Sequence, residues 1–153
     1  MESRRFTKVM QVLPASVLAA FGLGMTPALA GKDFAGPVAA SVVEILDGDT
    51  FVADAHVWPG QTIRVNIRIR GIDAPEMKSR CATEHSAALE ARDVLADLLQ
   101  GGEVSISNIG SAKYYGRVLA DVVTRDGDSV GPIMLDLGLA RPYWGGRRDG
   151  WCG

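Results

Sequence analysis

The clearest pattern in the sequence is a strict alternation of apolar and polar residues from Gln61 to Arg70. Apolar side chains occupy one face, at Ile63, Val65, Ile67 and Ile69, and basic side chains lie on the other, at Arg64, Arg68 and Arg70. A period of two predicts a β-strand with an apolar inner face and a basic outer face. Because Pro75 cannot donate to a strand ladder, the carboxylates of Asp73 and Glu76 are predicted to lie on a rigid turn at the strand's end.

Similar patterns predict four more strands and two helices. The further strands are expected over Val38–Leu46, Thr50–Val57, Glu103–Asn108 and Arg117–Thr124. From Thr83, a candidate N-cap, to Gln100 the apolar residues recur at helical spacing, and two glycines follow. A short helix is expected over Pro132–Leu137, with Gly138 beyond its end. This order of elements predicts an α+β fold, mainly β: a five-stranded OB-type barrel with one main helix and one short helix.

The N-terminus has the composition of an export signal. Positive residues at Arg4, Arg5 and Lys8 precede an apolar stretch and an Ala28-Leu29-Ala30 cleavage pattern. Prolines and glycines interrupt that stretch, which favours a signal over a membrane anchor. We therefore expect a cleaved signal peptide over residues 1–30, a flexible lead-in over 31–37, one domain over 38–144 and a tail over 145–153. Ordinary secretion and twin-arginine export both stay open, as do a periplasmic and an extracellular destination.

Charge and cysteine content narrow the function classes. The 16 basic and 18 acidic residues give a net charge of −2, which argues against nucleic-acid binding through bulk charge but leaves room for a local basic site. Cys81 and Cys152 are the only cysteines. In an exported protein they are predicted to form one disulfide, which would hold the C-terminal tail beside the Asp73 turn.

A second acidic cluster, Asp47-Gly48-Asp49, precedes the second strand. If Asp49 and Asp73 meet, their mutual repulsion is most simply relieved by a metal ion, and hard oxygen donors favour Ca²⁺ or Mg²⁺ over zinc. Glu76 is a candidate general base for a water molecule beside that ion. The alternative is that Asp47 and Asp49 are simply turn residues, as Asp-Gly pairs often are.

Arginines and tyrosines near these carboxylates suit a phosphate substrate. Arg68 and Arg117 can offset charge on a phosphate, although Arg70 competes with Arg68 for this role. Tyr115 and Tyr143 can stack on a base or simply pack at the barrel mouth. No G-x-S-x-G or P-loop pattern occurs in the sequence.

Four segments together resemble the thermonuclease (staphylococcal nuclease) family: residues 45–50, 68–76, 115–120 and 138–143. The resemblance implies a five-stranded OB-fold barrel and Ca²⁺-dependent hydrolysis of DNA and RNA that leaves 3′-phosphorylated products. DNA and RNA are then the expected substrates. Separately, nothing in the sequence implies a protein partner, and we expect a monomer. The alternative is a non-catalytic OB-fold module that binds nucleic acid.

The same resemblance assigns roles to individual positions. It implies Asp49, Asp73 and the backbone carbonyl of Ala74 as calcium ligands. The other implied roles are Arg68 and Arg117 as catalytic arginines, Glu76 as general base, Asp47 as an acid acting through water, and Tyr115 and Tyr143 as nucleotide-binding residues. The spacing to Asp73 then selects Arg68 over Arg70. The tail from Pro142 to Cys152 lies outside the shared pattern, and it either clamps the site or seals the barrel.

Overall fold

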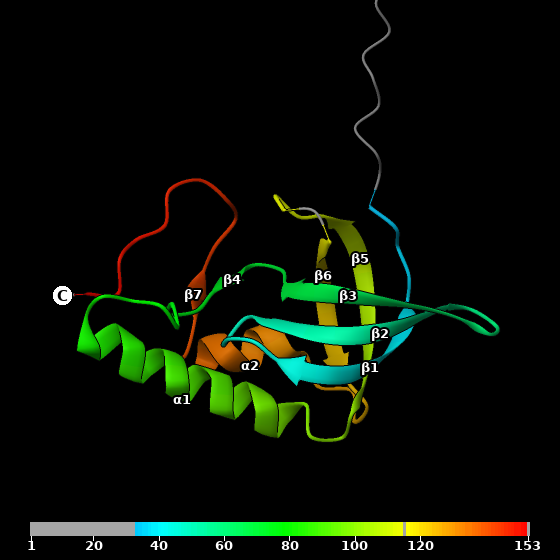
Figure 1. Cartoon of the computed structure of the whole chain (residues 1–153), viewed down its shortest axis with the longest axis horizontal. Coiled ribbons are helices and arrows are strands. Elements are labelled where there is room, and N and C mark those ends of the chain that lie inside the picture. Colours follow the sequence, from blue (N-terminus) through cyan, green and yellow to red (C-terminus); the bar gives the residue numbers. More distant parts are fainter. Residues whose placement is uncertain (1–32, 115, 153) are drawn as a thin grey trace, which may run out of the picture. The chain divides into compact units, whose positions relative to one another are not determined.

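The computed structural model describes residues 33–114 and 116–152, in which five strands close into a barrel (Figure 1). They are β1 (Val38–Ile45), β2 (Thr50–Trp58), β3 (Gln61–Ile69), β5 (Glu103–Ser111) and β6 (Arg117–Thr124). Around the barrel the order is β1-β2-β3-β6-β5. Only the β3–β6 pairing is parallel. The predicted α+β barrel is confirmed, while the predicted signal peptide lies outside the described residues.

The apolar face of the alternating strand enters the core only over its second half. Ile67 and Ile69 are fully buried and pack with Phe51 of β2 and Ile106 of β5. By contrast, Ile63 is 55% exposed. The β2–β3 hairpin extends beyond the barrel at that end, so the alternation continues where no core exists to cover it (Figure 1).

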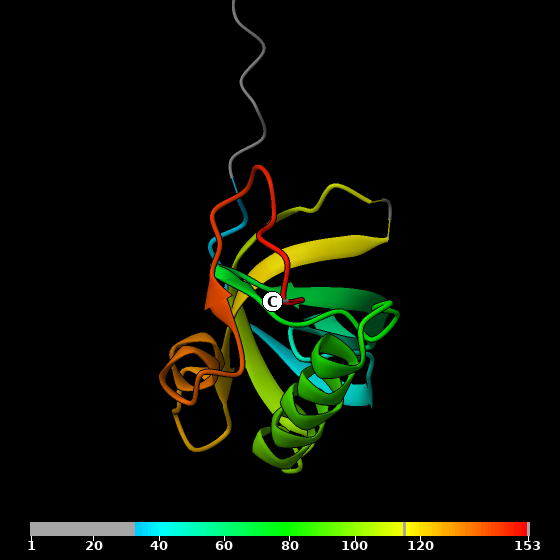
Figure 2. The same cartoon turned by 90° about the vertical axis from the view of Figure 1, so that its left-hand side faces the viewer.

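Two helices lie side by side at one end of the barrel (Figure 2). Helix α1 (Ala82–Leu98) buries Ala88, Ala91 and Leu95. Its N-cap is Cys81 rather than the predicted Thr83, because the helix begins directly after the disulfide-bonded residue. Helix α2 (Val130–Asp136) begins two residues before Pro132, which is tolerated because the N–H groups of a first turn have no partner within the helix. No helix in the described residues is long and apolar enough to cross a membrane.

A small second sheet guides the C-terminal segment back toward the end of β3. Strand β4 (Ile72–Asp73) pairs with β7 (Arg141–Pro142), which sets Asp73 opposite Arg141. The predicted disulfide is confirmed: Cys81 and Cys152, 71 residues apart, are bonded with their Cα atoms 6.1 Å from each other. The segment between β7 and Cys152, here called the tail, is therefore anchored at both ends (red in Figure 1).

Candidate metal and phosphate site

Strand pairing brings two distant carboxylates together. The pairing of Thr50 with Arg68 sets the turn before β2 beside the end of β3, and Ile69 donates its N–H to the carbonyl of Asp49 at 2.8 Å. Asp73 follows directly in β4. Asp49 and Asp73 are only 2% and 5% exposed, so both acids are buried at this edge of the barrel.

One guanidinium group joins the two acids. Arg68 donates from Nη1 to Oδ1 of Asp49 at 2.5 Å and from Nη2 to Oδ1 of Asp73 at 2.9 Å. Asp49 also accepts the N–H of Ala74 at 2.9 Å and the hydroxyl of Thr50 at 2.8 Å. The two carboxylates thus converge on a single cation, and their oxygens are held in fixed directions by neighbouring donors.

The turn that carries Asp49 packs without spare space. A Cβ atom on Gly48 would lie 2.6 Å from the Cβ of Ala91 on α1 and 2.8 Å from the Cβ of Ala74. Only glycine therefore allows the turn to approach both the helix and Ala74. The Asp47 carboxylate accepts the N–H of Asp49 at 3.0 Å, so its contact here is that of a turn residue.

Burial has a clear electrostatic effect on Asp49. Desolvation raises the pKa of this carboxyl to about 6. Arg68 opposes that rise, and the nearby charge of Asp47 adds to it. Although the ion pair with Arg68 is short, burial has the larger effect. A further positive charge near Asp49 would therefore favour its ionised form.

A third basic residue, Arg148, reaches the same oxygens from the tail. Its Nη2 lies 2.5 Å from Oδ1 of Asp73 and 3.3 Å from the carbonyl oxygen of Ala74. Its Nη1 is paired with the carboxylate of Glu76. Partial burial acts against the charged form, but the hydrogen bonds to Asp73 and Glu76 prevail and raise the pKa of Arg148. The roles predicted from sequence did not include Arg148; the only signal was a disulfide expected to bring the tail to this turn.

The turn after Glu76 is ordered by a buried acid that the predictions also omitted. Glu84, 9% exposed, accepts the N–H of Glu76 at 3.2 Å and the hydroxyl of Ser79 at 2.6 Å. The sequence did carry a signal for this residue. Glu84 lies at helical spacing from Ala88 and Ala91, and so on the buried face of α1.

The other two arginines considered for the phosphate-binding role, Arg70 and Arg64, form contacts elsewhere in the barrel. Arg70 is paired with Asp33 and donates to the backbone carbonyls of Asn108 and Leu119, so it ties strand ends together. Arg64 forms two 2.8 Å hydrogen bonds with Asp54 at the surface. Of Arg64 and Arg68 in β3 and Arg70 directly after it, Arg68 is the one that contacts the two buried acids.

The second proposed catalytic arginine lies on the neighbouring strand. Arg117 pairs in register with Asn66, which places it on the same barrel face as Arg68. Its guanidinium lies 5.5 Å from the ring centre of Tyr114, and within the described residues it forms no ion pair. Tyr143 donates its hydroxyl to the carbonyl of Gly146 at 2.8 Å, inside the tail. Tyr115 lies outside the described residues.

The donors gathered here fit a hard divalent cation. Asp49, Asp73 and the carbonyl of Ala74 offer only oxygen, as Ca²⁺ and Mg²⁺ require, and both carboxylates are buried and already share a cationic partner. Cys81, Glu84 and Cys152 also lie close together, but both sulfurs belong to the disulfide and offer no thiolate to a metal.

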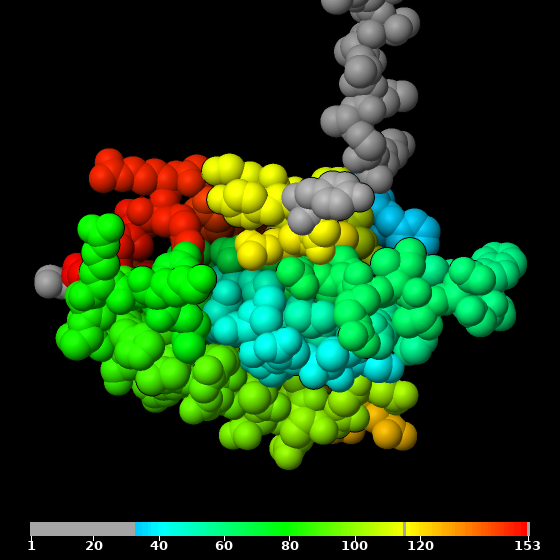
Figure 3. All heavy atoms as spheres, viewed as in Figure 1, coloured from blue at the N-terminus to red at the C-terminus, as the bar shows by residue number. Residues whose placement is uncertain are grey.

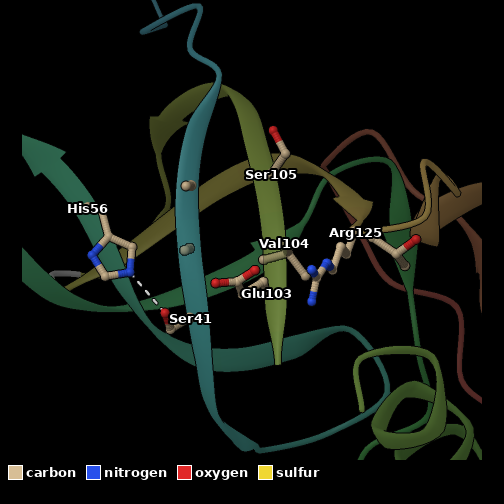
Figure 4. Close-up of a pocket in the computed structure, with 9 residues that line it drawn as sticks. Ser41, His56, Glu103, Val104, Ser105 and Arg125 are labelled. Carbon is tan, nitrogen blue, oxygen red and sulfur yellow. Dashed lines mark hydrogen bonds between the residues drawn. The ribbon is translucent and has the colours of Figure 1, made fainter. Parts of the chain in front are cut away.

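A separate crevice of about 260 Å³ is lined by residues of β1, β2, β5 and the end of β6, and none of the acids of the candidate site lines it (Figure 4). Within it, Ser41 Oγ and His56 Nε2 are 2.9 Å apart. The other ring nitrogen of His56 is approached by the Thr62 hydroxyl at 3.4 Å and not by a carboxylate. This pair therefore lacks the acid that would orient a catalytic histidine.

The closed five-stranded barrel and the Asp–Arg–Asp cluster at its edge are the features we expect of a staphylococcal nuclease-like domain. The family model described as "Staphylococcal nuclease homologue" matches residues 66–149, more than half of the chain, and the chain belongs to this family. Two relatives, each described as an uncharacterized endonuclease, come from Escherichia coli and from E. coli O157:H7. Each is 33% identical over 103 residues, which is 67% of this chain and 59% of the relative. The chain thus spans about three fifths of the length of these curated relatives.

Proposed function

We propose that this protein is a divalent-cation-dependent nuclease that hydrolyses phosphodiester bonds in DNA and RNA, with Ca²⁺ as the cation and 3′-phosphorylated products. The observation that carries the proposal is the convergence of buried Asp49 and Asp73 on Arg68, beside the Ala74 carbonyl and Glu76. Membership of the nuclease family and the endonuclease descriptions of the two relatives support it.

Each residue has a role that its position supports. Asp49, Asp73 and the Ala74 carbonyl would hold the cation, which supplies positive charge that polarises the phosphodiester. Arg68 would present its planar fork to phosphate oxygens at the same edge, where two parallel N–H groups match two oxygens. Glu76, whose side chain is 53% exposed, would accept the proton of the attacking water.

The direct test is hydrolysis of single- and double-stranded DNA and RNA by the purified protein with Ca²⁺, with Mg²⁺ and with chelator. We expect cleavage with Ca²⁺ and none with chelator. Products with a 3′-phosphate have a 5′-hydroxyl, so a polynucleotide kinase should label their 5′ ends without prior dephosphorylation. Undiminished cleavage in chelator would refute metal dependence. Binding of nucleic acid without turnover would favour the non-catalytic OB-fold module instead.

Substitutions test the assigned roles. Glu76→Gln removes the proton acceptor and Arg117→Ala removes a phosphate-facing cation, so each should lower the hydrolysis rate by about 10²-fold or more. Arg117→Lys should also be slow, because a point charge does not replace a fork. Arg64→Ala is the matched control, since among the described residues the Arg64 side chain hydrogen-bonds only to Asp54. Near-normal rates for the Glu76 or Arg117 variants, with circular dichroism unchanged, would overturn the assignment.

We also propose that residues 1–30 direct export and are removed. The Cys81–Cys152 disulfide supports this proposal, because such bonds persist mainly in oxidising compartments. The intact mass of protein recovered outside the cytoplasm should match a chain that begins at Gly31 and carries no free thiol.

A further inference from the structure

The tail delivers a positive charge to the oxygens that the proposed function reserves for the metal ion. Arg148 contacts Oδ1 of Asp73, the carbonyl of Ala74 and the carboxylate of Glu76. Two of these three groups are the proposed calcium ligands, and the third is the proposed general base. In the space-filling view the tail, in red, lies at the surface near the green segment that follows β4 (Figure 3).

Sterically, Arg148 and a cation would compete for one position. A single atom, Nη2, lies within 3.3 Å of both the Asp73 carboxylate and the Ala74 carbonyl. A calcium ion lies about 2.3–2.6 Å from its oxygen ligands. An ion bound to both of these oxygens would therefore overlap the guanidinium, which has to move before the ion can bind.

The tail is built to keep Arg148 close to the site. Beyond Arg148, Trp151 stacks against Arg141 with the guanidinium 3.8 Å from the ring centre, and Cys152 is bonded to Cys81. Before Arg148, the hydroxyl of Tyr143 braces the turn at Gly146. Because the tail is anchored on both sides of Arg148, the guanidinium has a high effective concentration at the acids. It therefore competes with any cation that binds there.

We propose that Arg148 is a built-in competitor for the divalent cation and that the disulfide-anchored tail sets the strength of this competition. The inference rests on the proposed function in taking Asp49, Asp73 and Ala74 as the cation ligands. Its consequence is an apparent cation affinity lower than the ligands alone would give. The site then loads fully only where the cation is abundant.

The test measures cation binding without substrate, by calorimetric titration of Ca²⁺ into the protein. If Arg148 occupies the site nine times in ten or more, Arg148→Gln should lower the dissociation constant by about tenfold or more. Arg147→Gln is the matched control: it removes the same charge one residue away, from an exposed side chain that forms no ion pair in the described part of the chain. It should leave the constant nearly unchanged.

A double-mutant cycle tests the contribution of the disulfide. Replacing Cys81 and Cys152 together by serine should tighten Ca²⁺ binding by loosening the tail, and the same change in the Arg148→Gln background should add nothing further. Thermal melts check folding. In chelator Arg148→Gln should melt below wild type because it leaves acids uncompensated, and saturating Ca²⁺ should close that difference.

The outcomes separate this proposal from the proposed function. Equal Ca²⁺ affinity in wild type and Arg148→Gln, or equal tightening by Arg147→Gln, would overturn the competition while leaving the metal site intact. Weaker Ca²⁺ binding by Arg148→Gln would overturn it as well, since Arg148 would then assist the cation. If neither protein binds a divalent cation while both melt cooperatively, the metal site and the competition are both wrong.

Discussion

Gly48 offers a sharp test of how the turn, helix α1 and the Ala74 segment are held together. In Gly48→Ala the new methyl group would lie 2.6 Å from the Cβ of Ala91 and 2.8 Å from that of Ala74, where ordinary contacts begin at 3.4 Å. Neither alanine has a rotamer that could yield. The backbone of the turn or of the helix has to shift by at least about 0.8 Å, and overpacking of this kind costs about 1–3 kcal/mol.

An opposing effect reduces the net change. Gly→Ala restricts the unfolded chain and so stabilises a compatible site by about 0.4–1 kcal/mol. We therefore expect Gly48→Ala to lose about 1–2 kcal/mol, a fall in melting temperature on the order of 5 °C for a domain of this size. Because the turn carries Asp49, Ca²⁺ binding should weaken in the same variant.

Gly131→Ala is the matched control. At that position the nearest atom to a new Cβ, the Cγ2 of Ile69, lies 3.5 Å away, an ordinary contact distance. This variant should melt at or slightly above the wild-type temperature, because Ala also favours helix α2 over Gly. Both variants are compared with wild type by thermal and urea unfolding in chelator. Equal stability of Gly48→Ala and Gly131→Ala would refute the close packing of the turn against α1.

Two further predictions concern the pH dependence of Ca²⁺ binding and the contribution of Arg70 to the stability of the barrel. Since burial raises the pKa of Asp49 to about 6 and a cation needs the ionised carboxylate, Ca²⁺ affinity should be full above about pH 7 and fall roughly tenfold per unit below about pH 6. Calorimetry showing equal affinity at about pH 5 and pH 7.5 would contradict this. Arg70→Ala removes hydrogen bonds to two backbone carbonyls and should cost about 1–3 kcal/mol in urea unfolding, whereas Arg64→Ala, at an exposed pair, should change stability little. Equal effects of the two substitutions would show that Arg70 does not hold the strands together.

The sequence predicted the strands well where alternation was strong. Strands β1, β2 and β3 were placed to within one residue at each end and β6 without error, whereas β5 continues three residues beyond its predicted end at Asn108. The β4–β7 pair was missed because a two-residue strand has no period, and its partners are chosen by the tertiary fold. The start of α1 was missed because Thr83 has the side chain of an N-cap, while the chain enters the helix from the disulfide at Cys81.

For the candidate site, too, some residues could be predicted from the sequence and others could not. Asp49 and Asp73 could be predicted because each ends a recognisable turn beside a strong strand, and pairing of those strands brings the two together. The contacts of Arg148 were not predicted: the expected disulfide brings the tail to the site, but the path of the tail also depends on β7, which no sequence pattern indicated. No local pattern in the tail distinguishes Arg148 from Arg147, yet only Arg148 meets the acids.

The parallel pairing of β3 with β6 brings together two parts of the chain that each supply residues of the candidate site. Residues up to the end of β5 supply both buried carboxylates, whereas Arg117 and Arg148 come from the chain beginning at β6. Cutting the chain between β5 and β6 would give two fragments, neither of which holds a complete site. Recovered hydrolysis would report that the fragments have reassociated, and the Cys81–Cys152 bond could then fix the reassembled pair covalently.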